Sequence, residues 1–579
     1  MSEILNNLTA VDGSYINVFV TSMRYLAPML VAILLWRCGK PLLTFRREPE
    51  IWAWLCLADG RKVPVTHWEN VIGRHKRCDI VMDFPTVSRN HAVLTRYDDG
   101  SWTIADINSK SGVRVNGRRA PISVLTELDV ISIGGIEMTL QPISRHQEAQ
   151  IAKLRTRGSS GIESITNLLV LSIFQVLSCM AFLFGSSGEY ALPILLGYGG
   201  ILVAQWALLV FYLTLDRPAF EIETLAFLLC SMGMAAIATV KPGETTKQLI
   251  ALILGLIVFL AVAWSMGDLE RAKVMRYVSA VLGVALLCIT LLFGKEYHGA
   301  KNWLVIGSLS IQPSELSKVC FVYVGASVMH RLLNKRNLIS FIVYTLVVCG
   351  CLALMNDFGT ALIFFFAFLT IAYLRSGSVG TIGLAITALG FAGTIALRIA
   401  PHALRRFASW RHIWDDPLGA GYQQTRALMC IGSGGLFGLG AGKGWMENLF
   451  AADSDMVFAT ICEEWGLIMA FLLVLAIVIL ALFAIRCASV SRSSFYAIGA
   501  CTAGAILLVQ TIFNVLGTVD VLPLTGVTMP FVSNGGSSMM CVWGLLAFIK
   551  AADTRQNASF AVRRGRNGGE IHEQDRGTL

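Results

Sequence analysis

Acidic and basic side chains stand at the edges of several long apolar runs in this sequence of 579 residues. Asp455 precedes one such run, and Asp357 opens another. Glu315 and Lys318 lie three positions apart at the start of a third, a spacing that places both on one helix face and allows an ion pair. Ionisable groups at membrane depth are costly, so each marks a candidate functional site. A carboxylate at such a position can accept a proton in general acid–base catalysis.

Further candidates lie close to these residues in the sequence. Glu463 and Glu464 are neighbours on a predicted helix, about 100° apart, so only one of them is expected to face a given cavity. The Pro/Gly-broken stretch 523–538 contains Ser533, and broken backbone at membrane depth lines either protein or a cavity. The candidate cations of the polar segment 400–455 are Arg405, Arg406, Arg411 and Lys443.

Several of these groups also have a purely structural interpretation. Glu315 and Lys318 could form a simple ion pair at a helix start, and Asp357 could cap its helix, which is the commonest role of such a residue. The arginines of the segment 400–455 could meet lipid headgroups or an acidic polymer. The sequence leaves these alternatives open.

The elements that must position these groups are membrane spans. Hydrophobic residues make up 55% of the chain and charged residues 15%, and the mean hydropathy is +0.63, which argues against a wholly water-soluble protein. The 14 cysteines are scattered singly, many within apolar runs, so they predict neither a disulfide framework nor a zinc site. About thirteen runs have the length that a bilayer demands. They are 16–36, 165–185, 190–214, 222–240, 247–266, 275–294, 316–331, 339–355, 359–375, 378–399, 456–485, 494–518 and 534–551.

The distribution of charge predicts how these spans are oriented. The formal net charge of +9 resides in short segments between apolar runs, which is typical of membrane orientation and not of a nucleic-acid surface. Basic residues follow the first run, so we expect the N-terminus outside and the next segment in the cytoplasm. With thirteen crossings the segment 400–455 is extracytoplasmic and the C-terminal tail cytoplasmic.

Residues 50–142 have a different character, with short alternating stretches punctuated by Gly, Asp and Asn that predict a small β-sandwich. Within it stand Gly73-Arg74, Ser88-Arg89-Asn90-His91 and Asn116-Gly117. This order resembles a forkhead-associated (FHA) domain, which implies phosphothreonine recognition by loops at one end of the sandwich. On that resemblance Arg74, Ser88, Arg89, Ser111 and Asn116 form the phosphopeptide site, and His91 supports a loop from within.

One departure from the FHA pattern affects this expectation. Ser111-Gly112-Val113 stands where the family commonly has Asn-Gly-Thr, so an Asn that would hold the ligand backbone is missing. The alternative is a degenerate domain that serves only for docking.

Motifs across residues 220–555 resemble the SEDS family (FtsW, RodA, SpoVE) of membrane-embedded peptidoglycan polymerases. The matching elements are Gly299-Ala300…Trp303, Gln312-Pro-Ser-Glu-Leu-Ser-Lys318, Asp357-Phe-Gly-Thr360, Asp416-Pro-Leu-Gly-Ala-Gly-Tyr-Gln423, Ile431-Gly-Ser-Gly-Gly-Leu436, Glu463-Glu464-Trp-Gly466 and Val532-Ser-Asn-Gly-Gly-Ser537. The family core has ten helices, so the first three spans and the FHA domain are additions.

The SEDS resemblance implies a reaction in which lipid II is polymerised into glycan strands. The family's essential aspartate precedes an apolar run ending in Glu-Glu-x-Gly, which places it at Asp455. Glu315, Lys318, Asp357, Glu463 and Ser533 are then expected to shape the substrate cavity. The stretch Leu449-Phe-Ala-Ala-Asp-Ser-Asp455 lacks the Pro, Glu and His that the family usually has before the aspartate. Trp445 stands where a basic residue is expected.

The sequence therefore predicts a multi-pass α-helical protein of the bacterial cytoplasmic membrane with an inserted cytoplasmic β-sandwich. Expected partners are lipid II, a class B penicillin-binding protein (a transpeptidase) and a phosphothreonine-containing protein of a Ser/Thr kinase pathway, and nucleic acid is not expected. No cofactor is firmly implied, and a divalent cation (Mg²⁺ or Mn²⁺) stays open. A lipid II flippase and a non-catalytic scaffold are the alternatives. The predicted domains are an anchor at 1–49, the FHA domain at 50–142, a linker at 143–163, two extra spans at 164–219, the core at 220–555 and a basic tail at 556–579.

Overall fold

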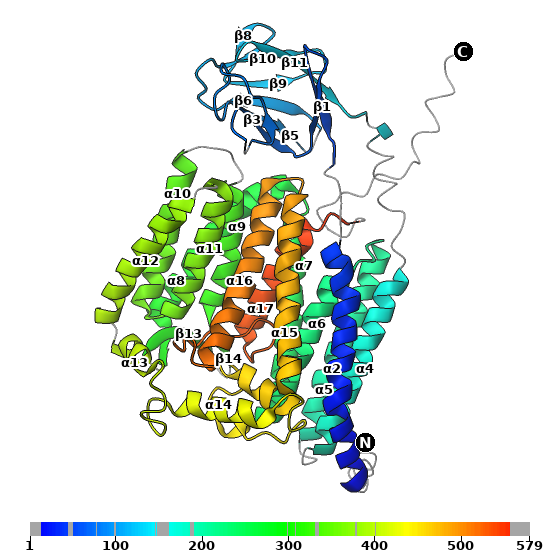
Figure 1. Cartoon of the computed structure of the whole chain (residues 1–579), viewed down its shortest axis with the longest axis vertical. Coiled ribbons are helices and arrows are strands. Elements are labelled where there is room, and N and C mark those ends of the chain that lie inside the picture. The colour runs from blue at the N-terminus through cyan, green and yellow to red at the C-terminus, as the bar shows by residue number, and fades with distance from the viewer. Residues whose placement is uncertain are drawn as a thin grey trace.

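A computed structural model shows a large helical bundle with a β-domain at one end (Figure 1). The predicted tail and most of the predicted linker lie outside the residues that the structure describes. The described residues are 13–44, 50–76, 78–97, 100–144, 146–147, 161–185, 190–297, 299–306, 309–329, 335–376, 379–399 and 401–555.

Each predicted span corresponds to a helix. Within the described part of the chain, nine helices are long and apolar enough to cross a membrane. The long helices are α2 (Gly13–Thr44), α4 (Gly161–Gly185), α5 (Ala191–Thr214), α6 (Glu221–Val240), α7 (Thr245–Ser265), α8 (Leu269–Phe293), α9 (Pro313–Met329), α10 (Lys335–Leu354), α11 (Phe358–Ser376), α12 (Val379–Ile399), α15 (Val457–Ser489), α16 (Ser494–Thr518) and α17 (Gly536–Ala552).

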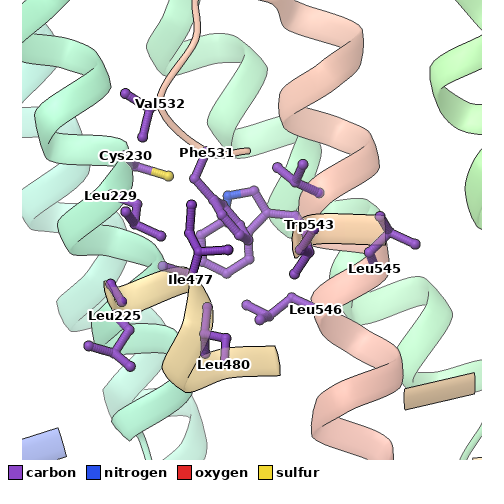
Figure 2. Packing of buried hydrophobic residues seen from close by; sticks show 14 of the residues in the cluster. Leu225, Leu229, Cys230, Ile477, Leu480, Phe531, Val532, Trp543, Leu545 and Leu546 are labelled. Atoms are coloured by element: carbon purple, nitrogen blue, oxygen red, sulfur yellow. The ribbon is translucent and has the colours of Figure 1, made fainter. Parts of the chain in front are cut away.

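The core of the bundle lies between α6, α15 and α17. Figure 2 shows Leu229 of α6 and Ile477 of α15 around the indole ring of Trp543 from α17. The ring of Phe531 meets that indole edge-on, with centroids 5.8 Å apart. Aromatic pairs in this geometry add to the stabilisation from apolar burial. The same packing fixes the chain segments that enter α15 and α17 at one end of the bundle.

That end carries elements that the sequence did not predict. They are the three-stranded sheet of β12 (Lys295–Tyr297), β13 (Ala300–Ile306) and β14 (Leu309–Ile311), and the short helices α13 (Pro401–Ser409) and α14 (Tyr422–Gly434). Figure 1 shows β13, β14, α13 and α14 at the end of the bundle opposite the β-domain. The predicted loop 400–455 is therefore partly helical.

The β-domain is a sandwich of two sheets, as predicted. Its strands follow the orders β2-β1-β11-β10-β7-β8 and β4-β3-β5-β6-β9. Residues 130–142 form a hairpin of two strands, in whose turn Gly134 and Gly135 take positive φ angles of 60° and 86°. The strands are β1 (Ala53–Leu57), β2 (Lys62–Val65), β3 (Glu69–Gly73), β4 (Ile80–Val81), β5 (Ala92–Arg96), β6 (Trp102–Asp106), β7 (Val113–Val115), β8 (Arg118–Arg119), β9 (Ile122–Leu125), β10 (Val130–Ile133) and β11 (Ile136–Pro142).

The β-domain contacts the turn between α15 and α16. The backbone N–H of Trp68 donates to the carbonyl oxygen of Arg492 at 2.7 Å. The Arg492 guanidinium forms an ion pair with Glu50 at 3.1 Å and lies 5.2 Å from the ring centroid of Trp52. Ion pairing and cation–π attraction together hold this arginine against the β-domain. No sequence pattern indicated this docking, which joins the sandwich to the C-terminal end of the helix that begins next to Asp455.

Candidate functional site

A cavity of about 1180 Å³ opens at the end of the bundle that carries β13, α13 and the start of α17. Its wall combines apolar side chains with several charged groups. The charged lining residues are Lys241, Glu244, Lys247, Glu315, Asp357, Arg406, Asp453 and Asp455. The cavity therefore brings together carboxylates and cations that are up to 214 positions apart in the sequence (241 to 455).

Asp455 lines this cavity immediately before α15 begins at Val457. The amide nitrogen of the Asn514 side chain donates to the Asp455 carbonyl oxygen at 2.9 Å. Gly526, whose φ is +70°, lies beneath the side chain, since a Cβ there would be 3.4 Å from Asp455 Oδ2 and 3.7 Å from Arg406 Nη1. The carboxylate and the guanidinium thus approach the same glycine, and its lack of a side chain leaves room between them.

Asp357 has both of the roles considered for it. Its Oδ1 accepts a hydrogen bond from the Thr360 backbone N–H at 3.2 Å, which makes it the N-cap of α11. Its Oδ2 accepts from the side-chain amides of Asn302 and Gln312, each at 3.1 Å. Asp357 also lines the cavity. The Asp357 carboxylate is therefore held at the cavity wall by the helix N-terminus and by the side-chain amides of Asn302 and Gln312.

Glu315 and Lys318 form the ion pair that their spacing indicated. Lys318 Nζ lies 2.8 Å from Glu315 Oε1, and the two side chains are 1% and 7% exposed respectively. Glu315 lines the cavity, whereas Lys318 does not. The pair therefore supports the wall from within the protein, and removal of either partner would leave a buried charge uncompensated.

The two neighbouring glutamates of α15 both hold one loop. Glu463 accepts hydrogen bonds from the backbone N–H groups of Trp445 and Met446, each at 2.9 Å. Glu464 accepts from the Thr239 hydroxyl at 2.7 Å and from the Gly444 N–H at 3.4 Å. Only Glu463 lines the smaller cavity of about 220 Å³ beside Trp445, which agrees with the expectation that the two side chains face different ways. Neither glutamate lines the large cavity, so Glu463 does not belong to the cavity that contains Asp455.

The other predicted cavity residues have mixed outcomes. Arg406 lines the cavity, and the side chain of Arg405 lies outside the described part of the structure. Arg411 stacks on Trp410 at 5.2 Å and does not line the cavity. Lys443 donates to Asn17 Oδ1 at 3.3 Å, away from the lining residues.

Ser533 connects two chain segments and does not line the cavity. Its hydroxyl donates to the Ser454 carbonyl oxygen at 2.7 Å and accepts from the Met529 N–H at 2.8 Å. Both bonding directions of the hydroxyl are therefore used within the protein. Ser533 holds the residue next to Asp455, so its effect on the cavity is indirect.

Four charged lining residues were not predicted, namely Lys241, Glu244, Lys247 and Asp453. Lys241 and Glu244 fall in the short polar stretch between the predicted spans 222–240 and 247–266, and Lys247 is the first residue of the second of these spans. A polar stretch between two spans was the sequence feature that could have indicated these lysines and this glutamate as candidates. Within the described residues, no group of three or more His, Cys, Asp or Glu side chains could hold a metal ion.

The β-domain gathers three loops at one end of the sandwich. The Arg74 N–H donates to the Ser88 carbonyl oxygen at 3.0 Å, and the Lys110 N–H donates to the Ser88 hydroxyl at 3.1 Å. The Ser111 hydroxyl donates to the Thr86 carbonyl oxygen at 3.3 Å. These bonds bring together the loops that carry Arg74, Ser88 and Ser111, and the side chains of Arg74 and Arg89 are exposed beside them. An exposed guanidinium at such loops can fork onto phosphate oxygens.

His91 and Asn116 have structural roles in this domain. His91 is fully buried, and its ring contacts the Ser88 N–H at 3.1 Å and the Gly112 carbonyl at 3.2 Å, which confirms that it supports the loops from within. The Asn116 amide donates to Asp129 Oδ1 at 2.6 Å and accepts from the Val130 N–H at 2.9 Å. Asn116 therefore holds the turn after β7, and its assignment to the phosphopeptide site stays a prediction.

Comparisons with known proteins agree with both halves of this description. The family model FTSW_RODA_SPOVE, described as cell cycle protein, matches residues 220–558, and the FHA domain model matches residues 70–134. The chain is 32% identical over 297 residues to a probable peptidoglycan glycosyltransferase FtsW of Buchnera aphidicola, which covers 49% of this chain and 74% of that protein. It is 31% identical to a probable peptidoglycan glycosyltransferase FtsW of Tolumonas auensis, covering 60% and 97%. A peptidoglycan glycosyltransferase RodA of Mycobacterium tuberculosis is 27% identical, covering 53% and 69%.

Proposed function

The chain belongs to the cell cycle protein family FTSW_RODA_SPOVE, and on this premise we propose that it is a peptidoglycan glycosyltransferase that polymerises lipid II. Its FHA domain binds a phosphothreonine-containing protein and recruits the enzyme to it. The core alone spans residues 220–558, so the anchor, the FHA domain and the two extra helices lie outside the catalytic family region.

The observation that carries this proposal is the meeting of Asp455 with cations in one large cavity. The 4-hydroxyl oxygen of one lipid II disaccharide forms a bond to the anomeric carbon of the growing chain, and the bond from that carbon to the diphosphate breaks. Asp455 accepts the hydroxyl proton as a general base. Undecaprenyl pyrophosphate leaves, the anomeric configuration inverts, and cations such as Arg406 stabilise the departing charge.

The placement of the acids favours catalysis over lipid transport. A transport pathway needs polar groups through both leaflets. Here Asp357, Asp453 and Asp455 line one cavity at a single end of the bundle. The non-catalytic scaffold is disfavoured for a related reason, since Asp455 is retained and is held by its own hydrogen bond from Asn514.

Reconstitution distinguishes the enzyme from a transporter. Purified full-length protein in liposomes with labelled lipid II on both faces is expected to produce glycan strands. A flippase would instead move lipid II across the bilayer without polymerising it. Addition of the cognate class B penicillin-binding protein is expected to increase polymerisation, since that transpeptidase is the proposed partner.

The proposed orientation places the FHA domain in the cytoplasm and the cavity on the outer face. Basic residues flank the FHA domain on both sides. The cavity is lined by residues of β13, β14 and α13, and Figure 1 shows these elements at the opposite end of the bundle. The membrane of residence is the bacterial cytoplasmic membrane, where lipid II is available.

Two cysteine substitutions test this orientation. Leu128 of the FHA domain and Leu418 of the segment 400–455 are 91% and 78% exposed. We expect a membrane-impermeant maleimide to label Leu418→Cys in intact cells, and Leu128→Cys only after permeabilisation. The unmodified chain, with its 14 native cysteines, provides the background. Labelling of Leu128→Cys in intact cells would refute the orientation.

A further inference from the structure

Asp453 anchors the chain segment that carries Asp455. Its side chain is 2% exposed, and both of its carboxylate oxygens accept from Lys241 Nζ, at 3.1 and 3.0 Å. The side-chain amide of Asn534 donates to Asp453 Oδ2 at 2.6 Å. A buried carboxylate is tolerated when it is paired and hydrogen-bonded in this way. Asp453 thereby joins the end of α6, the entry to α15 and the entry to α17.

The backbone around Asp455 is held at three successive carbonyl oxygens. The Asn534 N–H donates to the Asp453 carbonyl at 2.7 Å, and the Ser533 hydroxyl donates to the Ser454 carbonyl at 2.7 Å. The Asn514 amide donates to the Asp455 carbonyl at 2.9 Å. None of these three hydrogen bonds involves Lys241. We therefore expect the Asp455 backbone to keep these three contacts when Lys241 is replaced.

Lys241 differs from the buried lysine of the same cavity wall. Its side chain is 50% exposed and lines the cavity, whereas Lys318 is 1% exposed and does not. If Lys241 Nζ turned to a bound anion, Asp453 would keep its hydrogen bond from Asn534. Asn534 also donates to Glu244 Oε2 at 3.0 Å, so the local network has a second connection.

We propose that Lys241 is a diphosphate-binding residue of the cavity, and that Asp453 holds its ammonium group at the wall when the site is empty. The inference rests on the proposed function, because it assigns the diphosphate to lipid II and to the undecaprenyl pyrophosphate product. Lys241 then acts on the diphosphate side of the cavity, and Asp455 acts on the hydroxyl side. We expect the loss of Lys241 to weaken diphosphate binding by about the strength of one charge-assisted hydrogen bond.

The test compares Lys241→Met with Lys443→Met, a matched control whose lysine does not line the cavity. Polymerisation of lipid II by each full-length variant gives kcat and KM, and added undecaprenyl pyrophosphate gives an inhibition constant. For Lys241→Met we expect the inhibition constant and KM to rise on the order of tenfold, with a smaller change in kcat. Lys241→Arg should restore most of the affinity, and Lys443→Met should match the wild type.

A second substitution separates ligand binding from a structural ion pair. Asp453→Asn keeps a side chain of the same shape, and we expect it to retain affinity for undecaprenyl pyrophosphate, while Lys241→Met/Asp453→Asn behaves like Lys241→Met. If Lys241 and Asp453 formed only a structural ion pair, Lys241→Met would act by leaving the charge of Asp453 unpaired. The double variant has neither charge, so it would then recover wild-type kinetics and melting temperature. That recovery would overturn the inference.

Inorganic pyrophosphate distinguishes the source of the diphosphate. Inhibition by inorganic pyrophosphate that also weakens in Lys241→Met would show that the diphosphate alone is recognised. Inhibition only by the lipid-linked form, again weakened, would assign the site to the lipid carrier. An inhibition constant for undecaprenyl pyrophosphate that is unchanged in Lys241→Met would refute this inference while wild-type polymerisation still stands. Absence of polymerisation by the wild-type protein would instead refute the proposed function.

Discussion

Replacing Asp455 with asparagine is expected to abolish glycan polymerisation while the protein still folds and inserts. The amide has the shape of the carboxylate but cannot accept the proton of the attacking hydroxyl. General-base catalysis contributes about 10²–10⁴-fold to a rate, so the loss should reach that size. The bond that holds the segment uses the Asp455 carbonyl oxygen and survives the substitution. Rates of strand formation from purified lipid II measure the effect.

Asp415→Asn is the matched control for this experiment. Asp415 belongs to the same polar segment, pairs with His412 in an exposed position and does not line the cavity. We expect wild-type rates from it. Strand formation by Asp455→Asn at a rate close to that of the wild type would contradict the catalytic assignment, and an equal melting temperature of the two variants would exclude misfolding as the cause of a loss.

Arg74→Ala is expected to abolish binding of phosphothreonine peptides. The exposed guanidinium stands beside the loop of Ser88 and supplies a forked, charge-assisted contact to phosphate. Its loss should cost about 1.5–3 kcal/mol, or on the order of 10- to 100-fold in affinity. Calorimetry with phosphorylated and unphosphorylated peptides measures it. Arg118→Ala is the control, because Arg118 is an exposed arginine of β8, outside these loops.

The same substitution tests recruitment against direct coupling. Arg74→Ala should leave polymerisation by the purified enzyme unchanged while the protein becomes diffuse in cells. Coupling has a physical route, since Arg492 joins the β-domain to the turn after α15 and α15 begins next to Asp455. Such a chain of contacts does not by itself show that the protein switches between two conformational states. A lower rate for Arg74→Ala without phosphopeptide, reproduced by Arg492→Ala, would show that recruitment is the wrong account.

A wild-type protein that binds no phosphothreonine peptide would have a different meaning. Ser111 stands where the FHA pattern commonly has an asparagine, and its hydroxyl is already bonded to the Thr86 carbonyl oxygen. The domain would then act as a docking module, for which the contact between Trp68 and Arg492 is the observed surface.

The membrane spans could be predicted because each carries its own signal in a continuous apolar run. The predicted run 359–375, for example, corresponds to α11 (Phe358–Ser376). The sheet of β12 to β14 and the helices α13 and α14 were missed because short elements in a polar segment are stabilised by contacts with distant parts of the chain. The docking of the sandwich through Arg492 was missed for the same reason.

The acids of the site could be predicted better than the cations. Asp455, Asp357 and Glu315 each stand at the edge of a span, where a charged group is conspicuous. Lys241 pairs with Asp453 across 212 positions, and no local pattern indicates such a contact. Of the cations in the segment 400–455, Arg406 lines the cavity and Arg411 does not. Arg406 belongs to α13 and Arg411 to the turn that follows, so their side chains point in different directions.

The most direct test of the central claim is the stoichiometry of the reaction catalysed by the purified wild-type chain. Lipid II as the sole substrate should be consumed with formation of glycan strands, and one undecaprenyl pyrophosphate should be released for each new glycosidic bond. Strand length and released carrier can be measured in the same sample. Lipid II that remains intact, or crosses the membrane without release of its carrier, would contradict the assignment of the cavity around Asp455 as a polymerase active site.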